Sequence, residues 1–179
     1  MTTTAAAAAA AAEPPELVIE MQKVCTRFGS HAVHTDLDLD VRAGEILGIA
    51  GVSGNGQQEL MAALSGEDAR APNDSVHLLG HDISRQPPRE RRAAGLHFVP
   101  EERLGRGAVP TLSLAANTLL TRTGAIGRAG WIDTFEVTKL AQQIIRRFNV
   151  KSGGPAAAAK SLSGGNLQKF IVGREIDAN

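Results

Sequence analysis

The stretch "EILGIAGVSGNGQQEL", Glu45–Leu60, decides how the rest of the chain is interpreted. It begins as a continuous apolar run, continues as a loop with three glycines, and then favours a short helix that stops at Gly66. A buried parallel strand, a glycine-rich loop and a helix make the first half of a βαβ unit. Because small residues let backbone N–H groups converge on an anion at a helix start, the stretch predicts an α/β fold with a candidate phosphate loop.

The loop departs from the phosphate-loop pattern G-x-x-x-x-G-K-[ST] at its last two positions. Gly51, Gly54 and Gly56 are present, but Gln57 and Gln58 stand where Lys and then Ser or Thr are expected. Two interpretations stay open: a nucleotide site without its cation and hydroxyl, and a glycine-rich turn with a purely structural role. A dinucleotide-binding oxidoreductase is disfavoured, because it requires the different spacing G-x-G-x-x-G.

Bulk composition indicates an ordinary soluble domain and names no partner. The 179 residues are 42% hydrophobic and 21% charged, and 19 Lys and Arg balance 19 Asp and Glu. No net field therefore draws the chain toward nucleic acid. The single cysteine, Cys25, cannot form an internal disulfide and is predicted to be a buried thiol. Residues 1–16 are rich in Ala and are expected to form a disordered tail, and no run of 18 apolar residues predicts a membrane span.

Alternating residues predict antiparallel strands before the glycine loop. The segments "ELVIEMQKV" and "HTDLDLDVRAGE" alternate apolar and polar residues, so Leu37, Leu39 and Val41 share one face. After the loop, "SVHLLG" and "GLHFVP" are further strand candidates, separated by a helical "PRERRAA". These segments predict a sheet with one solvated face.

The chain becomes helical from Ser113 onward. "SLAANTLL" favours a helix with Ser113 as its N-cap, and Asp133 with Glu136 resembles a capping box for a second helix. That second helix carries its apolar residues on one stripe: Val137, Leu140, Ala141, Ile144, Ile145 and Phe148. A helical insert is therefore predicted between the sheet and the last segment.

The segment "LSGGN", Leu162–Asn166, opens a further amphipathic helix in which Leu167, Phe170 and Ile171 face the same way. A serine and two glycines at a helix start offer one hydroxyl and exposed backbone amides to an anion. The alternative is a capped loop with no ligand. Two such anion-accepting segments in one chain ask for a joint explanation.

The combination resembles the ATP-binding cassette (ABC) family over Leu17–Asp177. "GVSGNGQQEL" is similar to the Walker A loop, "FVPEERLGRG" followed by "SLAAN" to the Q-loop and the start of the helical subdomain, and "LSGGNLQK" to the signature motif. In detail the motifs resemble the second cassette of the tandem ATPases that drive simple-sugar and nucleoside importers. The resemblance implies a P-loop NTPase (RecA-like) α/β core with an N-terminal antiparallel β subdomain over 17–112, a helical subdomain over 113–160, and the signature motif and helix over 161–179.

The resemblance also assigns residues to ligands. In the family, two cassettes stack head to tail, and each ATP lies between the Walker A loop of one and the signature motif of the other. The implied nucleotide-binding residues are Phe28, Gly51, Ser53, Gly54, Asn55, Gly56, Gln57, Gln58 and Glu101, and the implied signature residues are Leu162, Ser163, Gly164, Gly165 and Asn166. The implied cofactors are ATP and Mg²⁺, weakly bound or absent because the Walker A loop is degenerate; no catalytic residue and no metal ligand is assigned.

Two of these residues keep alternative interpretations. Glu101 stands where the Q-loop normally contacts Mg²⁺, and it is equally suited to pair with Arg103. Phe28 matches the aromatic residue that stacks on adenine, and a half-buried strand residue is the alternative. Trp131 is interpreted either as a core residue or as a contact to a membrane partner.

The family pattern further implies what surrounds the chain. The sequence ends at Asn179, before the segment that would carry the Walker B strand, so the fold is expected to be truncated there and the fragment inactive as an ATPase alone. The implied partners are a second cassette, membrane permease subunits and, indirectly, a solute-binding protein, with no nucleic acid. The implied location is the cytoplasmic face of the cell membrane, peripherally bound. The rival hypothesis is a regulatory or scaffold module that binds no nucleotide.

Overall fold

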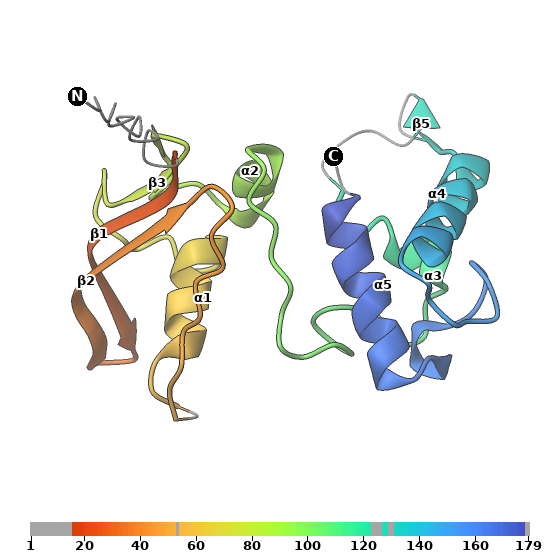
Figure 1. Cartoon of the computed structure of the whole chain (residues 1–179), viewed down its shortest axis with the longest axis horizontal. Coiled ribbons are helices and arrows are strands. Elements are labelled where there is room, and N and C mark those ends of the chain that lie inside the picture. Colours follow the sequence, from red (N-terminus) through yellow and green to blue (C-terminus); the bar gives the residue numbers. More distant parts are fainter. Residues whose placement is uncertain (1–15, 53, 123–126, 129–130, 178–179) are drawn as a thin grey trace, which may run out of the picture. The chain divides into compact units, whose positions relative to one another are not determined.

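The computed structural model describes residues 16–52, 54–122, 127–128 and 131–177. The chain divides into two compact units, whose helices and strands can be followed in Figure 1. The first unit comprises the described residues of Met1–Leu64 and Asp68–Arg85, and the second comprises those of Ser65–Glu67 and Gln86–Asn179.

The first unit is built on an antiparallel sheet of four strands in the order β2-β1-β3-β4. Strands β1 and β2 form a long hairpin, and β3 pairs with the other edge of β1. The strands and the helix that follows the glycine loop have these bounds: β1 Leu17–Phe28, β2 His31–Arg42, α1 Gln57–Ser65, β3 Val76–Leu78 and β4 His81–Asp82. The antiparallel strands predicted from the alternating segments are therefore confirmed.

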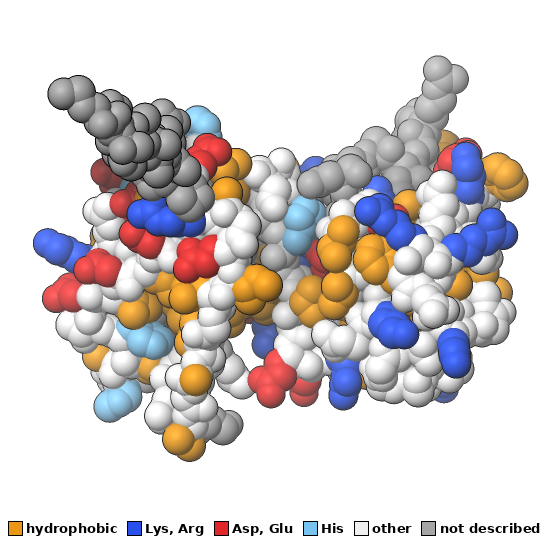
Figure 2. All heavy atoms as spheres, viewed as in Figure 1, with side chains coloured by type: hydrophobic (Ala, Val, Ile, Leu, Met, Phe, Trp, Pro, Cys, Tyr) orange, Lys and Arg blue, Asp and Glu red, His pale blue; other side chains and the backbone are white. Residues whose placement is uncertain are grey.

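The alternation along β2 is also confirmed. Leu37, Leu39 and Val41 are half-buried, and the aspartates between them are exposed. Figure 2 shows acidic side chains gathered over the surface of this unit. One face of the hairpin is thus apolar and the other is solvated.

Cys25 is exposed, so the prediction of a buried thiol is wrong. The register of β1 against β2 shifts between Met21 and Val24 and again between Val24 and Thr26. These irregularities place Met21, Val24 and Thr26 on the buried face, and Cys25 between them points outward. A local bulge, which alternation alone does not reveal, therefore decides the exposure of the thiol.

The apolar run at 45–50 is not a strand, which corrects a second prediction. Ile46 is 98% exposed and Ile49 is half exposed, and the segment 96–100 also lacks strand pairing. A parallel strand needs hydrogen-bonded neighbours, and the sheets formed by the described residues contain antiparallel pairs alone. An apolar run without such neighbours forms no strand and stays exposed to solvent.

The second unit is mainly helical, and its elements follow in chain order. Ser113 caps α3 through its hydroxyl, and Asp133 caps α4 by accepting from the N–H groups of Phe135 and Glu136, so both predicted N-caps are confirmed. Helix α3 is shorter than the expected "SLAANTLL". The bounds are α2 Pro88–Ala93, α3 Leu114–Asn117, β5 Gly127–Arg128, β6 Trp131–Ile132, α4 Thr134–Arg147, the 3₁₀ helix η1 Ala159–Ser161 and α5 Gly164–Ile176.

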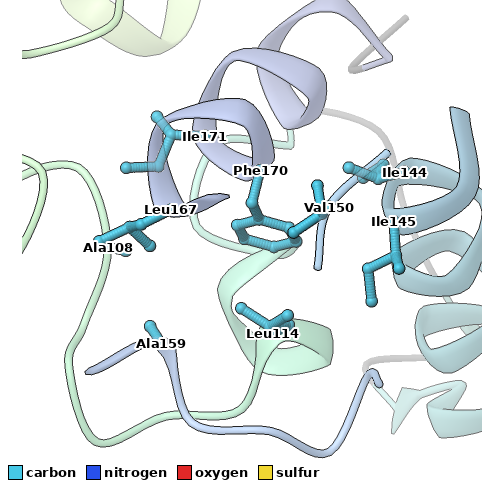
Figure 3. Packing of buried hydrophobic residues seen from close by; sticks show 9 residues of the cluster. All are labelled: Ala108, Leu114, Ile144, Ile145, Val150, Ala159, Leu167, Phe170 and Ile171. Atoms are coloured by element: carbon cyan, nitrogen blue, oxygen red, sulfur yellow. The ribbon is translucent and has the colours of Figure 1, made fainter. Parts of the chain in front are cut away.

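The core of the second unit forms around Phe170, which projects from α5 toward Leu114 and Val150 (Figure 3). The apolar stripe predicted for α4 is confirmed, because its residues are buried or half-buried. The stripe predicted for α5 is confirmed as well. The buried cluster contains Ala108, Leu114, Ile144, Ile145, Val150, Ala159, Leu167, Phe170 and Ile171.

A glycine lets α4 and α5 approach closely. A Cβ atom on Gly173 would overlap the ring of Phe148, the C-cap residue of α4.

The side chain of Asn117 ties the end of α3 to the segment before it. It accepts from the N–H of Val109 and donates to three backbone oxygens of the segment 109–113. The same segment accepts from the N–H groups of Ala159 and Lys160, through the carbonyls of Leu112 and Pro110, and these two residues lead into the start of α5.

Candidate functional site

The glycine loop of the first unit has the backbone that only glycine adopts easily. Gly54 and Gly56 have φ angles of +89° and +97°. A Cβ on Gly56 would lie 2.6 Å from Cγ1 of Val33, so this position also has no space for a side chain. The N–H of Leu60 donates to the carbonyl of Gly56 at 2.9 Å and starts α1. Ser53 lies outside the described residues.

Gln57 folds back over this loop. Its Nε2 donates to the carbonyl of Val52 at 3.2 Å, and a Cβ on Gly51 would overlap the same amide. Asn55 and Gln58 are exposed beside it. The first turn of α1 carries an acidic residue, Glu59, and no cation. A neutral amide that bonds the backbone of the loop therefore stands where a phosphate loop would offer a positive charge.

Phe28 ends β1 and is 73% exposed, opposite His31 of β2. The interpretation of Phe28 as a half-buried strand residue is therefore wrong. An exposed aromatic face is available for stacking on a base, which stays a prediction for this residue.

Glu101 and Arg103 do not form an ion pair with each other in the described structure, and both are exposed. The guanidinium of Arg103 lies instead against the first residue of α5, because a Cβ on Gly164 would be 3.4 Å from its Nη1. The loop that carries Arg103 is closed by a hydrogen bond from the N–H of Gly107 to the carbonyl of Glu102 at 2.9 Å. Sequence reasoning did not foresee this contact between two separate motifs.

The signature segment forms the open start of α5. Ser163 is the N-cap residue, the N–H of Leu167 donates to its carbonyl at 2.9 Å, and its side chain makes no hydrogen bond to the helix backbone. Ser163, Gly164 and Gly165 are exposed, and the first turn holds no acidic residue. Leu162 and Asn166 are half-buried beside them. A hydroxyl and the positive end of a helix dipole thus face solvent together.

The far end of α5 is fixed by buried charges. Glu175 is 3% exposed and accepts from Nε and Nη2 of Arg174, at 3.0 and 2.8 Å, and from Nη1 of Arg92. Burial acts to raise the pKa of Glu175, but the hydrogen bond from Arg92 and the charge of Arg174 outweigh it and hold that pKa below its usual value. Burial lowers the pKa of Arg174, against the influence of Glu175. Sequence reasoning missed this cluster.

The described residues contain no helix long and apolar enough to cross a membrane. They also contain no group of three or more His, Cys, Asp or Glu residues arranged to hold a metal ion. Trp131, at the start of β6, is 82% exposed and is not a core residue.

Solved structures define the fold first. The chain superposes with a TM-score of 0.72, at 20% identity, on the crystal structure of a nucleotide-free ATP-binding cassette from an ABC transporter, over 91% of this chain and 66% of that one. A dimeric structure of a post-hydrolysis state of the cassette MJ0796 bound to ADP and Pi gives a TM-score of 0.68 at 17% identity, over 90% of this chain and 70% of that one. The fold is that of an ATP-binding cassette, a mixed α/β P-loop NTPase.

The sequence then gives the family. A family profile described as "ABC transporter" matches residues 34–177, and the chain belongs to that family, whose cassettes use ATP and Mg²⁺. It is 36% identical to the nucleoside import ATP-binding protein NupA of Lactococcus lactis subsp. cremoris (strain MG1363), over 93% of this chain and 33% of the relative.

Two further curated relatives are similar over comparable lengths. The chain is 34% identical to the ribose import ATP-binding protein RbsA of Halalkalibacterium halodurans, over 90% of this chain and 31% of the relative. It is 38% identical to the guanosine import ATP-binding protein NupO of Bacillus subtilis (strain 168), over 80% of this chain and 28% of the relative. The chain spans about a third of the length of the curated relatives that it matches.

Proposed function

We propose that this chain is a nucleotide-binding domain of an importer for simple sugars or nucleosides, and that its signature motif completes an ATP site on a second cassette. The names of the relatives, which are import ATP-binding proteins for nucleosides, ribose and guanosine, support the class of solute. The proposed partners are that second cassette, a permease in the membrane and, through the permease, a solute-binding protein. The proposed location is the cytoplasmic face of the membrane.

The observation that carries this proposal is the open start of α5. A serine at an N-cap normally accepts a hydrogen bond from the helix backbone, but the hydroxyl of Ser163 does not. The two following glycines have no side chains that would shield the backbone amides. Donors held in place before a ligand arrives stabilise a negative charge without reorganisation, so this surface suits a phosphate.

The chain's own glycine loop does not fit Mg²⁺-bound ATP in the same way. The hydroxyl that would ligate Mg²⁺ and the cation that would contact the phosphates are replaced by Gln58 and Gln57. The amide of Gln57 is bonded to the carbonyl of Val52 and lies over Gly51. ATP is therefore proposed to bind here weakly or not at all, and no chemical step is assigned to this loop.

The proposed arrangement makes ATP hydrolysis depend on the closing of the two cassettes onto each other. ATP held by the second cassette supplies the phosphate, and Ser163, Gly164 and Gly165 contact it only when the two cassettes come together. The hydroxyl and amides then stabilise charge on the phosphate and exclude water from it. The motion that brings the motif to the phosphate is thereby made a condition for turnover.

The test compares two substitutions in the reconstituted transporter that contains this cassette. Ser163→Arg adds bulk at the proposed phosphate contact and is expected to abolish ATPase activity and transport, with ATP binding by the second cassette retained. Gln57→Ala is the control in the other motif and is expected to leave turnover within about twofold, because surface substitutions away from a used site have small effects. If Gln57→Ala abolishes turnover and Ser163→Arg spares it, the assignment of the two motifs is reversed.

A fluorescent ATP analogue separates this function from a scaffold that binds no nucleotide. A transporter in which the analogue binds saturably, with hydrolysis sensitive to Ser163, supports the proposal. Saturable binding of the analogue by the assembly, with hydrolysis that does not depend on Ser163, would establish the scaffold instead.

A further inference from the structure

Two serine N-caps of the second unit have almost the same backbone and different side-chain bonds. Ser113 has φ −62° and ψ 160°, and its Oγ accepts from the N–H of Ala116 at 3.1 Å. Ser163 has φ −63° and ψ 153°, and its Oγ makes no such bond. Backbone conformation therefore does not explain why one hydroxyl caps its helix and the other does not.

The difference lies in the third residue of each helix. After Ser113 that residue is Ala116, which has no polar side chain, but after Ser163 it is Asn166. The Nδ2 of Asn166 donates to the Oγ of Ser163 at 2.9 Å. A side-chain donor has taken the place of the backbone donor, so the backbone N–H of Asn166 is not bonded to the serine.

A distant backbone group fixes which way the amide of Asn166 faces. The N–H of Lys151 donates to Oδ1 of Asn166 at 3.0 Å. A backbone N–H is always a donor, so the atom that it contacts must be the amide oxygen. The opposite atom, which faces Ser163, must then be the NH₂ group. The two hydrogen bonds together therefore fix the orientation of this amide.

This orientation determines what the serine hydroxyl can do. Because Oγ of Ser163 accepts from the amide of Asn166, its own hydrogen points elsewhere, and the described residues offer it no hydrogen-bond acceptor. We infer that Asn166 is a positioning residue, which turns the hydroxyl hydrogen of Ser163 outward so that it donates to a phosphate oxygen. The inference rests on the proposed function of the signature motif.

Three side chains of similar size at position 166 test the polarity of this contact. Asn donates to Ser163, Leu neither donates nor accepts, and Asp accepts while it keeps the bond from Lys151. With Asp, the hydroxyl hydrogen is drawn back toward residue 166 and away from the phosphate. We expect ATPase activity of the transporter to fall less than about tenfold for Asn166→Leu, and about tenfold to a hundredfold for Asn166→Asp.

A merely structural role predicts the opposite order. Asp is nearly isosteric with Asn and preserves the bond to Lys151, so it would then be tolerated better than Leu. The KM for ATP is expected to change less than kcat, because the contact forms after ATP has bound to the second cassette. An Asp variant as active as wild type, or more active than the Leu variant, would overturn the inference.

Two controls separate polarity from charge. Gln168→Glu adds the same charge two residues further along α5 without contacting Ser163 in the described structure. Gln168 is half-buried, so solvent still reaches the new charge and screens it, and activity is expected to stay within about threefold. In a Ser163→Ala background, Asn166→Asp is expected to add little, since no hydroxyl remains to be turned. An equally large effect of Asn166→Asp in that background would overturn the inference in favour of simple repulsion.

These experiments also distinguish this inference from the proposed function. If Ser163→Ala alone leaves activity unchanged, the signature motif does not contact phosphate and the proposed function fails. If Ser163→Ala lowers activity but the order of the position 166 variants follows size and not polarity, the proposed function stands and the inference fails.

Discussion

Replacing Glu175 by Gln removes one charge from the buried end of α5 and keeps the shape of the side chain. The carboxylate is 3% exposed, contacts Arg174 at 2.8 Å, and is also hydrogen-bonded by Arg92. Arg174 is 1% exposed, so after the substitution a buried guanidinium faces a neutral amide. Removal of one partner of a buried ion pair costs about 3–5 kcal/mol, and we expect Glu175→Gln to fall in this range at neutral pH.

The pH dependence of this loss has a definite sign. The pKa of Glu175 in the folded chain lies below its ordinary value of 4.5, so its contribution to stability is complete above that pH and is lost as the pH falls through the folded pKa. The difference between wild type and Glu175→Gln is therefore expected to persist from neutral pH down to about 4.5 and to shrink below it.

Urea denaturation followed by circular dichroism, at neutral pH and below pH 4.5, measures both effects. Glu136→Gln is a matched control, because Glu136 pairs with Lys139 at 3.4 Å on the exposed face of α4. Such an exposed ion pair contributes about 0.3–0.5 kcal/mol to stability. A loss at Glu175 no larger than that at Glu136, or a loss that persists unchanged below the folded pKa, would refute the reasoning.

Two further predictions concern the glycine loop and the aromatic residues. The double substitution Gln57→Lys and Gln58→Ser restores a cation and a hydroxyl, so isothermal titration should show tighter ATP binding; no gain would mean that the loop backbone itself does not suit phosphate. Phe170→Ala empties the centre of the core and should lower the unfolding free energy by about 3–5 kcal/mol in urea denaturation, whereas exposed Phe28→Ala should cost less than about 0.5 kcal/mol. Similar losses for the two phenylalanines would contradict the packing described for this unit.

Local patterns predicted most of the elements, because the physics that sets them is local. The alternation of Leu37, Leu39 and Val41 requires one buried face wherever a hairpin forms, and the caps at Ser113 and Asp133 depend only on residues within one helical turn. The prediction of a strand at 45–50 was wrong, because a parallel strand depends on neighbouring strands that its own sequence does not contain.

The missed parts of the site depend on contacts that are distant in sequence. The bond from Lys151 to Asn166 spans 15 residues, and the packing of Arg103 on Gly164 joins two motifs. Arg174 is different, since it lies seven residues after Leu167 and four after Phe170, on the apolar stripe of α5. The helical spacing of Arg174 therefore indicated that it is buried. Arginine is so rarely buried, however, that the residue type indicated the opposite.

The helices of the second unit show why the start of α5 is a feature to be explained. At α4, Asp133 satisfies two backbone N–H groups and Glu136 adds negative charge to the first turn. Helix α5 has no side-chain bond at its N-cap and no acidic residue in its first turn. The missing cap bond makes the helix about 0.5–2 kcal/mol less stable than a capped helix.

The helix forms without this cap bond because the remainder of α5 is held by its packing. Phe170 packs in the centre of the core, and the close approach of Gly173 to Phe148 leaves α5 little freedom to shift. The open end is therefore rigid, and the guanidinium of Arg103 beside Gly164 adds positive charge to it. A helix start that is rigid, lacks a side-chain cap and carries positive charge adds little to the stability of the chain by itself. It is well suited to bind an anion that a partner supplies, because its donors need not reorganise when the negative charge arrives.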